Sequence, residues 1–181
     1  MIYILIGVIS DTHIPTRSVK IPEKVFEVFE GADMILHAGD LECDSVIEEL
    51  ETIAPVVCVR GNCDTNSNLN EAEVINIEDV KVGLTHGVVY PRGDTQQLYY
   101  IAKELGVDVL ISGHTHQPMV EKIDDVILLN PGSPTQPRLT DATVMVVEIN
   151  GSDIQADIIK IANAMCRSMD VSQLGLNYKK D

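Results

Sequence analysis

The sequence has few basic residues, and this scarcity limits the partners that it can bind. Its 13 lysine and arginine residues face 28 aspartate and glutamate residues, which gives a formal net charge of −15 at pH 7. Such a charge opposes binding to a nucleic-acid backbone or to an anionic membrane, so we expect neither an extended nucleic acid nor a membrane as partner. If the substrate is anionic, bound cations must overcome this repulsion locally.

A long apolar run is also missing. The opening stretch, Ile2–Ile9, is eight residues long, whereas a helix that crosses a bilayer needs about 20 residues. The first residues offer neither the basic segment nor the small-residue cleavage site of a secretory signal, so we expect a cytoplasmic protein. Ile2–Ile9 is therefore predicted to be a buried strand.

Cysteine is sparse as well, and no sequence repeat is visible. The four cysteines form no CxxC pair, which argues against a disulfide framework and against a thiolate zinc site. The length of 181 residues fits one compact domain. We expect this single domain to span residues 1–164, with residues 165–181 as a C-terminal helix or a loose tail.

Short apolar runs recur along the chain and predict strands. They are rich in valine and isoleucine, and several are apolar on both faces, as buried parallel strands are. The runs are Ile2–Ile9, Met34–His37, Val56–Val59, Val80–Thr85, Val109–Ile111, Val126–Leu129, Thr143–Ile149 and Ile154–Ile161, of which the last is also compatible with a helix.

Helix and turn signals lie between these runs. Helices are predicted after Pro22, after Asp44 and from Asp94 to Gly106, because these residue types favour helix ends. From His116 onwards the pattern changes to short strands separated by turns, at residues 124–125, 130–132 and 150–151, the last of which is a strong hairpin signal. We therefore expect mixed sheets with helices outside them.

Polar side chains follow five of the apolar runs, at the point where each predicted strand ends. In open α/β sheets, ligands bind at the carboxyl ends of the strands. Taken one by one, each aspartate is compatible with a capping role and each histidine with a structural role. Four of the five histidines gather at these ends, however, together with two carboxylates and a carboxamide, which favours one shared metal site. The residues are Asp11, His13, Asp40, Asn62, His86, His114 and His116.

The chemistry of this set narrows the choice of metal. A mixture of aspartate, histidine and asparagine is neither the all-oxygen cage of calcium nor the thiolate set of structural zinc. It suits Mn²⁺, Fe²⁺, Zn²⁺, Co²⁺ or Ni²⁺, and we expect Mn²⁺. His114 and His116 are two residues apart, so on extended backbone their imidazoles would point the same way, toward a shared metal.

The ordered motifs Asp11-x-His13, Gly39-Asp40, Gly61-Asn62, His86-Gly87 and Gly113-His114-x-His116 resemble the signature of the calcineurin-like metallophosphoesterase superfamily. They are most similar to its small YfcE-type phosphodiesterase branch, which has Vps29-like relatives. The resemblance implies an α/β (α+β) fold, a four-layer αββα sandwich of two mixed β-sheets flanked by helices.

The resemblance also implies a dinuclear site for two divalent transition-metal cations. One metal would be held by Asp11, His13, Asp40 and His116, and the other by Asp40, Asn62, His86 and His114, with Asp40 as the bridge. Two such cations can clamp a phosphoryl group and turn a water molecule into a hydroxide nucleophile. The expected substrate is a small phosphate ester, in particular a diester. The residues expected to be catalytic are Asp11, Asp40, Asn62 and His86.

One motif departs from the superfamily pattern. Many members have Gly-Asn-His-Asp/Glu, whereas this chain has Cys63 at the position of the histidine that helps to protonate the leaving group. Good leaving groups should therefore react more easily, because they require less proton donation. Cys63, Arg138 and His37 are candidate substrate contacts, and each also has a structural interpretation.

The main alternative is a non-catalytic protein-interaction module of the Vps29-like kind. All seven ligand positions hold residues that can bind a metal, which favours the enzyme. The sequence does not fix the oligomeric state, and a homo-oligomer is compatible with it.

Overall fold

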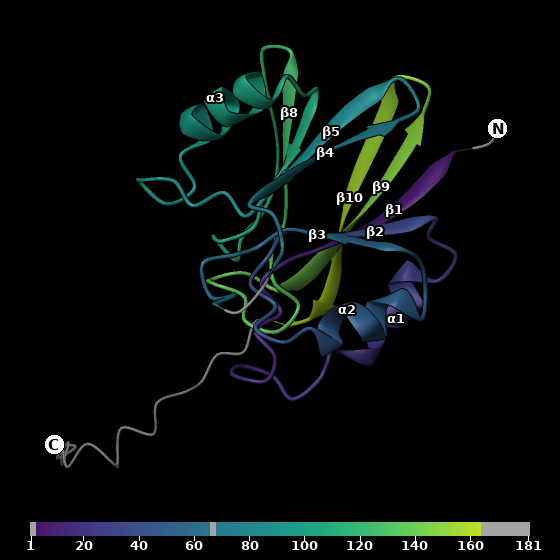
Figure 1. Ribbon diagram of the computed structural model, residues 1–181. Coiled ribbons are helices and arrows are strands. Elements are labelled where there is room, and N and C mark those ends of the chain that lie inside the picture. The colour runs from purple at the N-terminus through teal and green to yellow at the C-terminus, as the bar shows by residue number, and fades with distance from the viewer. Residues whose placement is uncertain (1–2, 66–67, 164–181) are drawn as a thin grey trace, which may run out of the picture.

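The computed structural model describes residues 3–65 and 68–163, which form two five-stranded sheets (Figure 1). The first sheet has the strand order β10-β9-β1-β2-β3, and the second has the order β4-β5-β6-β8-β7. The strands are β1 (Ile4–Ile9), β2 (Met34–His37), β3 (Val56–Cys58), β4 (Ala72–Ile77), β5 (Val80–Thr85), β6 (Val109–Ile111), β7 (Pro118–Ile123), β8 (Val126–Pro131), β9 (Ala142–Asn150) and β10 (Asp153–Ala162). The predicted tail, residues 165–181, lies outside the described residues.

Both sheets are mixed, as predicted. β1 runs parallel to β2 and antiparallel to β9, while β5 runs parallel to β6 and antiparallel to β4. The sheets pack face to face through one apolar core, to which β1 contributes Ile6 and Val8 and to which β5 contributes Val82 and Leu84. These strands are apolar on the inner face because that face is removed from water.

Three helices complete the four layers. α1 (Glu23–Phe29) and α2 (Ser45–Glu51) cover the outer face of the first sheet, with Phe29 and Leu50 fully buried against it. α3 (Thr95–Leu105) covers the second sheet, against which Leu98 and Ala102 pack. Figure 1 shows α1 and α2 beside β1 to β3, and α3 beside β8. The predicted αββα sandwich is thereby confirmed.

Most of the predicted helix ends and turns are present. The side chain of Asp94 caps α3 by accepting a hydrogen bond from the Gln97 N–H at 2.9 Å, and Gly106 ends the helix in the left-handed region. The hairpin after Asn150 joins β9 to β10, so the last apolar run is a strand. Asp44 precedes α2, but its side chain makes no capping hydrogen bond. The chain is already helical at Asp44, so that cap prediction was wrong.

Two strands escaped the sequence prediction, and one turn was misplaced. β4 and β7 lie at opposite edges of the second sheet and alternate half-buried with exposed residues, so neither contains a long apolar run. The turn expected at residues 130–132 begins later, because Asn130 and Pro131 still pair with β7. Among the described residues, no helix is long and apolar enough to span a membrane.

Candidate metal centre

The seven predicted ligands meet at one end of the sandwich. β1, β2 and β3 are parallel to one another, and so are β5 and β6, so their carboxyl ends lie at common edges of the two sheets. Each ligand-bearing loop leaves one of these strand ends. Asp11 and His13 follow β1, Asp40 follows β2, Asn62 follows β3, His86 follows β5, and His114 and His116 follow β6.

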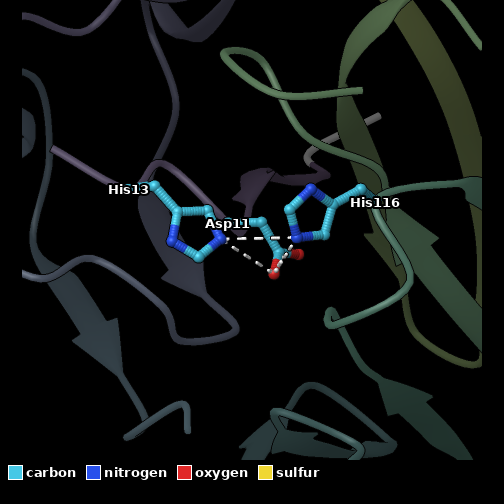
Figure 2. A group of neighbouring side chains, drawn as sticks. All are labelled: Asp11, His13 and His116. Atoms are coloured by element: carbon cyan, nitrogen blue, oxygen red, sulfur yellow. Dashed lines mark hydrogen bonds and ion pairs between the residues drawn. The ribbon is translucent and has the colours of Figure 1, made fainter. Parts of the chain in front are cut away.

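Ligand atoms from different loops approach one another closely. His116 Nε2 lies 3.3 Å from Asp11 Oδ1, and these two atoms face His13, as Figure 2 shows. His86 Nε2 lies 3.3 Å from Asp40 Oδ2, which is also 3.6 Å from His13 Nε2. Two ligand groups result, in each of which one ligand atom per residue lies within 4.8 Å of the others: Asp11, His13 and His116 form the first, and Asp11, Asp40 and His86 form the second. A third such group joins His13 to Glu42 and Cys63.

Asn62 and His114 lie beside the second group. The Asn62 Oδ1 atom is 3.1 Å from His86 Nε2. The rings of His86 and His114 are edge to face, with their centroids 5.2 Å apart. The structure therefore brings together all seven residues that the sequence singled out.

The outward nitrogens of three histidines are held by oxygen acceptors. His86 Nδ1 donates to the Ala38 carbonyl at 2.7 Å, and His116 Nδ1 donates to the Gln136 carbonyl at 2.6 Å. His13 Nδ1 lies 2.7 Å from a carboxylate oxygen of Glu42. Because these oxygens accept hydrogen bonds, Nδ1 carries a proton in each ring, and whenever the imidazole is neutral the lone pair is on the inward Nε2. Metal-binding histidines are typically oriented in this way.

This arrangement fits a bound cation. His13 Nε2 and His116 Nε2 are 3.3 Å apart, and both face the Asp11 carboxylate (Figure 2). When both imidazoles are neutral, these inward atoms are all acceptors, and their lone pairs repel one another. A cation between them would turn this repulsion into attraction. The nitrogen and oxygen donors suit a divalent transition metal.

The two carboxylates remain charged at neutral pH. Burial alone would raise the pKa of Asp40, but the hydrogen bond and the charge of His86 outweigh it and hold this pKa well below its usual range. The pKa of Asp11 is also lowered, because its hydrogen bond to His116 outweighs its burial. Both groups are therefore ready to bind a cation.

The backbone of the paired-histidine loop, residues 113–117, corrects one expectation. His114 and His116 have φ angles of 67° and 59°, in the left-handed region, and the backbone there is not extended. Their rings accordingly go to different neighbours: His116 lies 5.1 Å from the ring of His13, whereas His114 lies beside His86. The prediction that both imidazoles point the same way was wrong, because left-handed residues interrupt the alternation of an extended strand.

Backbone strain is concentrated at this site. Asp11, His13 and Asp40 also have positive φ angles, of 54°, 44° and 60°. Non-glycine residues adopt this region at a cost, and such residues cluster at functional sites. The surrounding hydrogen bonds hold the strained loops: Ser133 Oγ donates to the Asp11 carbonyl at 2.8 Å, and His114 N–H donates to the Asp11 carboxylate at 3.0 Å.

The sequence prediction missed Asp64, which is buried beneath the ligand loops. Its carboxylate accepts hydrogen bonds from the N–H groups of Asp40 at 2.8 Å, Glu42 at 2.8 Å and Gly61 at 2.7 Å. It thereby joins the loop after β2 to the loop after β3. Asp64 occupies the last position of the Gly-Asn-His-Asp/Glu motif, but the motif does not reveal this role, because the role depends on main-chain donors that only the fold brings together.

The three candidate substrate contacts lie in different environments. His37 is fully buried, and burial lowers its pKa to about 4. Its ring nitrogens bond to Thr12 Oγ1 and to the Gly39 N–H, each at 3.1 Å. Burial, together with the charge of Asp40, raises the pKa of Cys63 to about 11, the opposite of what a nucleophilic thiol requires. Arg138 is exposed and contacts the site through its main-chain N–H, which donates to the His116 carbonyl at 3.2 Å.

A cavity of about 510 Å³ adjoins the ligands of the second group. Asn62 and His86 line it, together with the apolar side chains of Val88 and Ile101. Arg60 lines it too, in an ion pair with Glu71. This cavity has room for the organic part of a small substrate.

Comparisons with known proteins agree with this geometry. A family model described as the calcineurin-like phosphoesterase superfamily domain matches residues 4–152. A probable metallophosphoesterase of Methanothermobacter thermautotrophicus is 56% identical over 168 residues, which cover 92% of this chain and 98% of the relative. The crystal structure of Vps29 from Entamoeba histolytica in complex with Zn²⁺ is 33% identical, with a TM-score of 0.74, over 87% of this chain and 99% of that chain. The structure of an archaeal phosphodiesterase is 26% identical, with a TM-score of 0.67, over 86% of this chain and 100% of that chain.

Proposed function

Since the chain belongs to the calcineurin-like phosphoesterase superfamily, we propose that it hydrolyses phosphate diesters at a centre of two divalent transition-metal cations, with Mn²⁺ as the expected metal. The observation that carries this proposal is the inward group of Asp11, His13 and His116, whose facing ligand atoms are placed to bind a cation together. The family and the relatives support a metal-dependent phosphoesterase. The diester preference and the second cation are the further steps of the proposal.

The seven residues divide between the two cations. Asp11, His13, Asp40 and His116 would hold one, and Asp40, Asn62, His86 and His114 would hold the other. The position of Asp40 supports its role as the bridge, because one of its oxygens lies within 3.6 Å of both His13 Nε2 and His86 Nε2. When bound, the cations would neutralise phosphoryl oxygens and lower the pKa of water enough to supply hydroxide.

Proton donation to the leaving group limits the substrate range. Cys63 stands where many superfamily members have histidine, and its raised pKa of about 11 makes the thiol a weak acid. Diesters whose leaving group departs without a proton, such as aryl diesters, should therefore react faster than dialkyl esters. The cavity beside Asn62 and His86 would hold the organic group.

A metal-by-substrate activity panel tests the proposal. Protein stripped with a chelator should lose hydrolysis of bis(p-nitrophenyl) phosphate and should regain it with Mn²⁺ or Ni²⁺. Elemental analysis should find two metal ions per chain after reloading. Hydrolysis that is unaffected by the chelator would overturn the proposal.

A non-catalytic interaction module is the second candidate. The likeness to Vps29 of Entamoeba histolytica favours it, because that structure covers 87% of this chain. The presence of a competent residue at each of the seven ligand positions favours the enzyme. A protein that binds two metal ions per chain but hydrolyses no ester of the panel would support the module.

A further inference from the structure

A second cavity, of about 590 Å³, lies on the outer side of the paired-histidine loop, residues 113–117. Its walls come from the loop before α3, α3 itself, the paired-histidine loop, the start of β7, the end of β8 and the loop after β8. The side chains that give it chemical character are Arg92, Arg138, Thr115, Asn130, Leu98 and Met119. The seven metal ligands are not among its lining residues.

Positive charge is concentrated in this cavity. Both arginines line it, and none of its described lining residues is acidic. Within residues 3–65 and 68–163, neither guanidinium is in an ion pair with a carboxylate. In a chain with a net charge of −15, two arginines without an acidic partner in one cavity favour an anionic occupant.

The remaining walls specify what the anion is attached to. Leu98, Met119 and Leu139 contribute apolar groups to the lining, while Thr115 and Asn130 contribute hydrogen-bonding groups. A simple inorganic anion would leave the apolar groups in contact with water. The cavity therefore suits an anionic group on an apolar or aromatic body.

The cavity is linked to the metal centre through the loop that separates them. The side-chain atom Arg92 Nη1 lies 3.5 Å from the His114 carbonyl, and the main-chain N–H of Arg138 donates to the His116 carbonyl at 3.2 Å. Asn130 Nδ2 donates to the Gly113 carbonyl at 2.8 Å and contacts Thr115 Oγ1 at 3.1 Å. The main chain of this loop thus bonds to cavity residues, while its two histidine rings lie beside those of His13 and His86.

We propose that this cavity binds a small organic anion, a phosphate or a carboxylate on an apolar body, and that its occupancy changes the metal affinity of the neighbouring centre. An anionic group of this kind can belong to a separate small molecule or to the far end of a diester substrate. The binding step does not depend on the proposed function, whereas the identification of the far end of a substrate does.

Calorimetry on the full chain tests binding by itself. Phenylphosphonate is titrated into protein stripped with a chelator, so that the acidic metal centre offers no cation to the probe. We expect the double variant Arg92→Gln/Arg138→Gln to raise the dissociation constant at least about tenfold, because two charge-assisted contacts are lost. Lys81→Gln, which removes one positive charge from an exposed residue of β5 that lines neither cavity, should bind like the wild type and is the matched control for each single arginine variant.

Several outcomes would overturn the proposal. These are a wild type that does not bind phenylphosphonate, a double variant that binds it equally well, and equal binding of uncharged benzyl alcohol. Both arginines are exposed, so the variants should fold, and the single variants with thermal melting curves check this. Binding that is unchanged in folded single and double variants counts against the cavity.

A second measurement addresses the coupling. The proposal predicts that phenylphosphonate changes the Mn²⁺ dissociation constant; by reciprocity Mn²⁺ must change the phenylphosphonate dissociation constant by the same factor, and both changes must disappear in the double variant. An Mn²⁺ affinity that is equal with and without phenylphosphonate would refute the coupling even if hydrolysis is absent. Kinetics with the metal-loaded enzyme distinguish the two sources of the anion. If the double variant has a higher KM than the wild type only for diesters with a distal carboxylate, the cavity binds the far end of the substrate. If free phenylphosphonate changes the hydrolysis rate of all diesters equally, the cavity binds a separate molecule.

Discussion

Replacement of Asp64 by asparagine should weaken both the fold and the metal centre. One carboxylate oxygen accepts from the N–H groups of Asp40 and Gly61, and the other accepts from the N–H of Glu42. An amide has only one acceptor oxygen, so its NH₂ group must face at least one of these donors. That donor is then buried without a partner.

The magnitude follows from these contacts. A lost hydrogen bond to a charged group costs about 1.5–3 kcal/mol, and a buried unsatisfied donor adds a similar penalty. The neutral amide is easier to bury than the carboxylate, which offsets part of this loss. We therefore expect Asp64→Asn to lower the free energy of unfolding by about 2 kcal/mol, and Asp64→Ala, which removes all the acceptors, to lower it by more.

Urea denaturation and Mn²⁺ titration measure the two effects. The matched control is Asp44→Asn, because Asp44 is exposed and makes no capping hydrogen bond, so its substitution should change stability little. The Asp64 variant should also bind Mn²⁺ more weakly, because Asp40 loses its main-chain support. An Asp64→Asn protein as stable as the Asp44 control, with unchanged metal affinity, would refute this account of the site.

Five further substitutions probe the centre. Asp40→Ala should remove both metals in elemental analysis, whereas Asn62→Ala should reduce mainly one, and equal loss in the two variants would contradict the bridge. Glu42→Gln should raise the Mn²⁺ dissociation constant by roughly 10–100-fold, as loss of a carboxylate behind a metal-bound histidine does. Gly61→Ala should prevent metal binding, because a Cβ there would overlap the main-chain nitrogen and the carboxylate of Asp40. Cys63→His should speed hydrolysis of dialkyl esters more than that of aryl diesters, and an equal effect on both would argue against proton donation from this position.

The sequence predicted those parts of the fold in which burial and sequence pattern coincide. Strands such as β1 and β6 are buried on both faces and form short apolar runs that can be found by inspection. β4 and β7 are edge strands, and their alternation of half-buried and exposed residues is too weak to find without the partner strand. Their pairing depends on contacts with β5 and β8, which the sequence does not display.

The same distinction applies to the metal centre. Its ligands could be predicted because each one follows an apolar run directly, and strand ends converge in this class of fold. The direction of the His114 and His116 rings could not be predicted, because it depends on left-handed backbone that the sequence pattern does not reveal. The roles of Asp64 and Glu42 were also hidden, since each is defined by the group to which it bonds.

The hydrogen bonds beneath the ligand loops compensate for the backbone strain of the site. Five of the seven proposed ligands have left-handed backbone, which is unfavourable for residues with a Cβ. Hydrogen bonds from the protein itself, such as those of Asp64 and Ser133, hold these loops. These hydrogen bonds offset part of the cost of ordering the ligands, a cost that would otherwise weaken metal binding. It follows that substitutions beneath the site should lower metal affinity even when every ligand is retained.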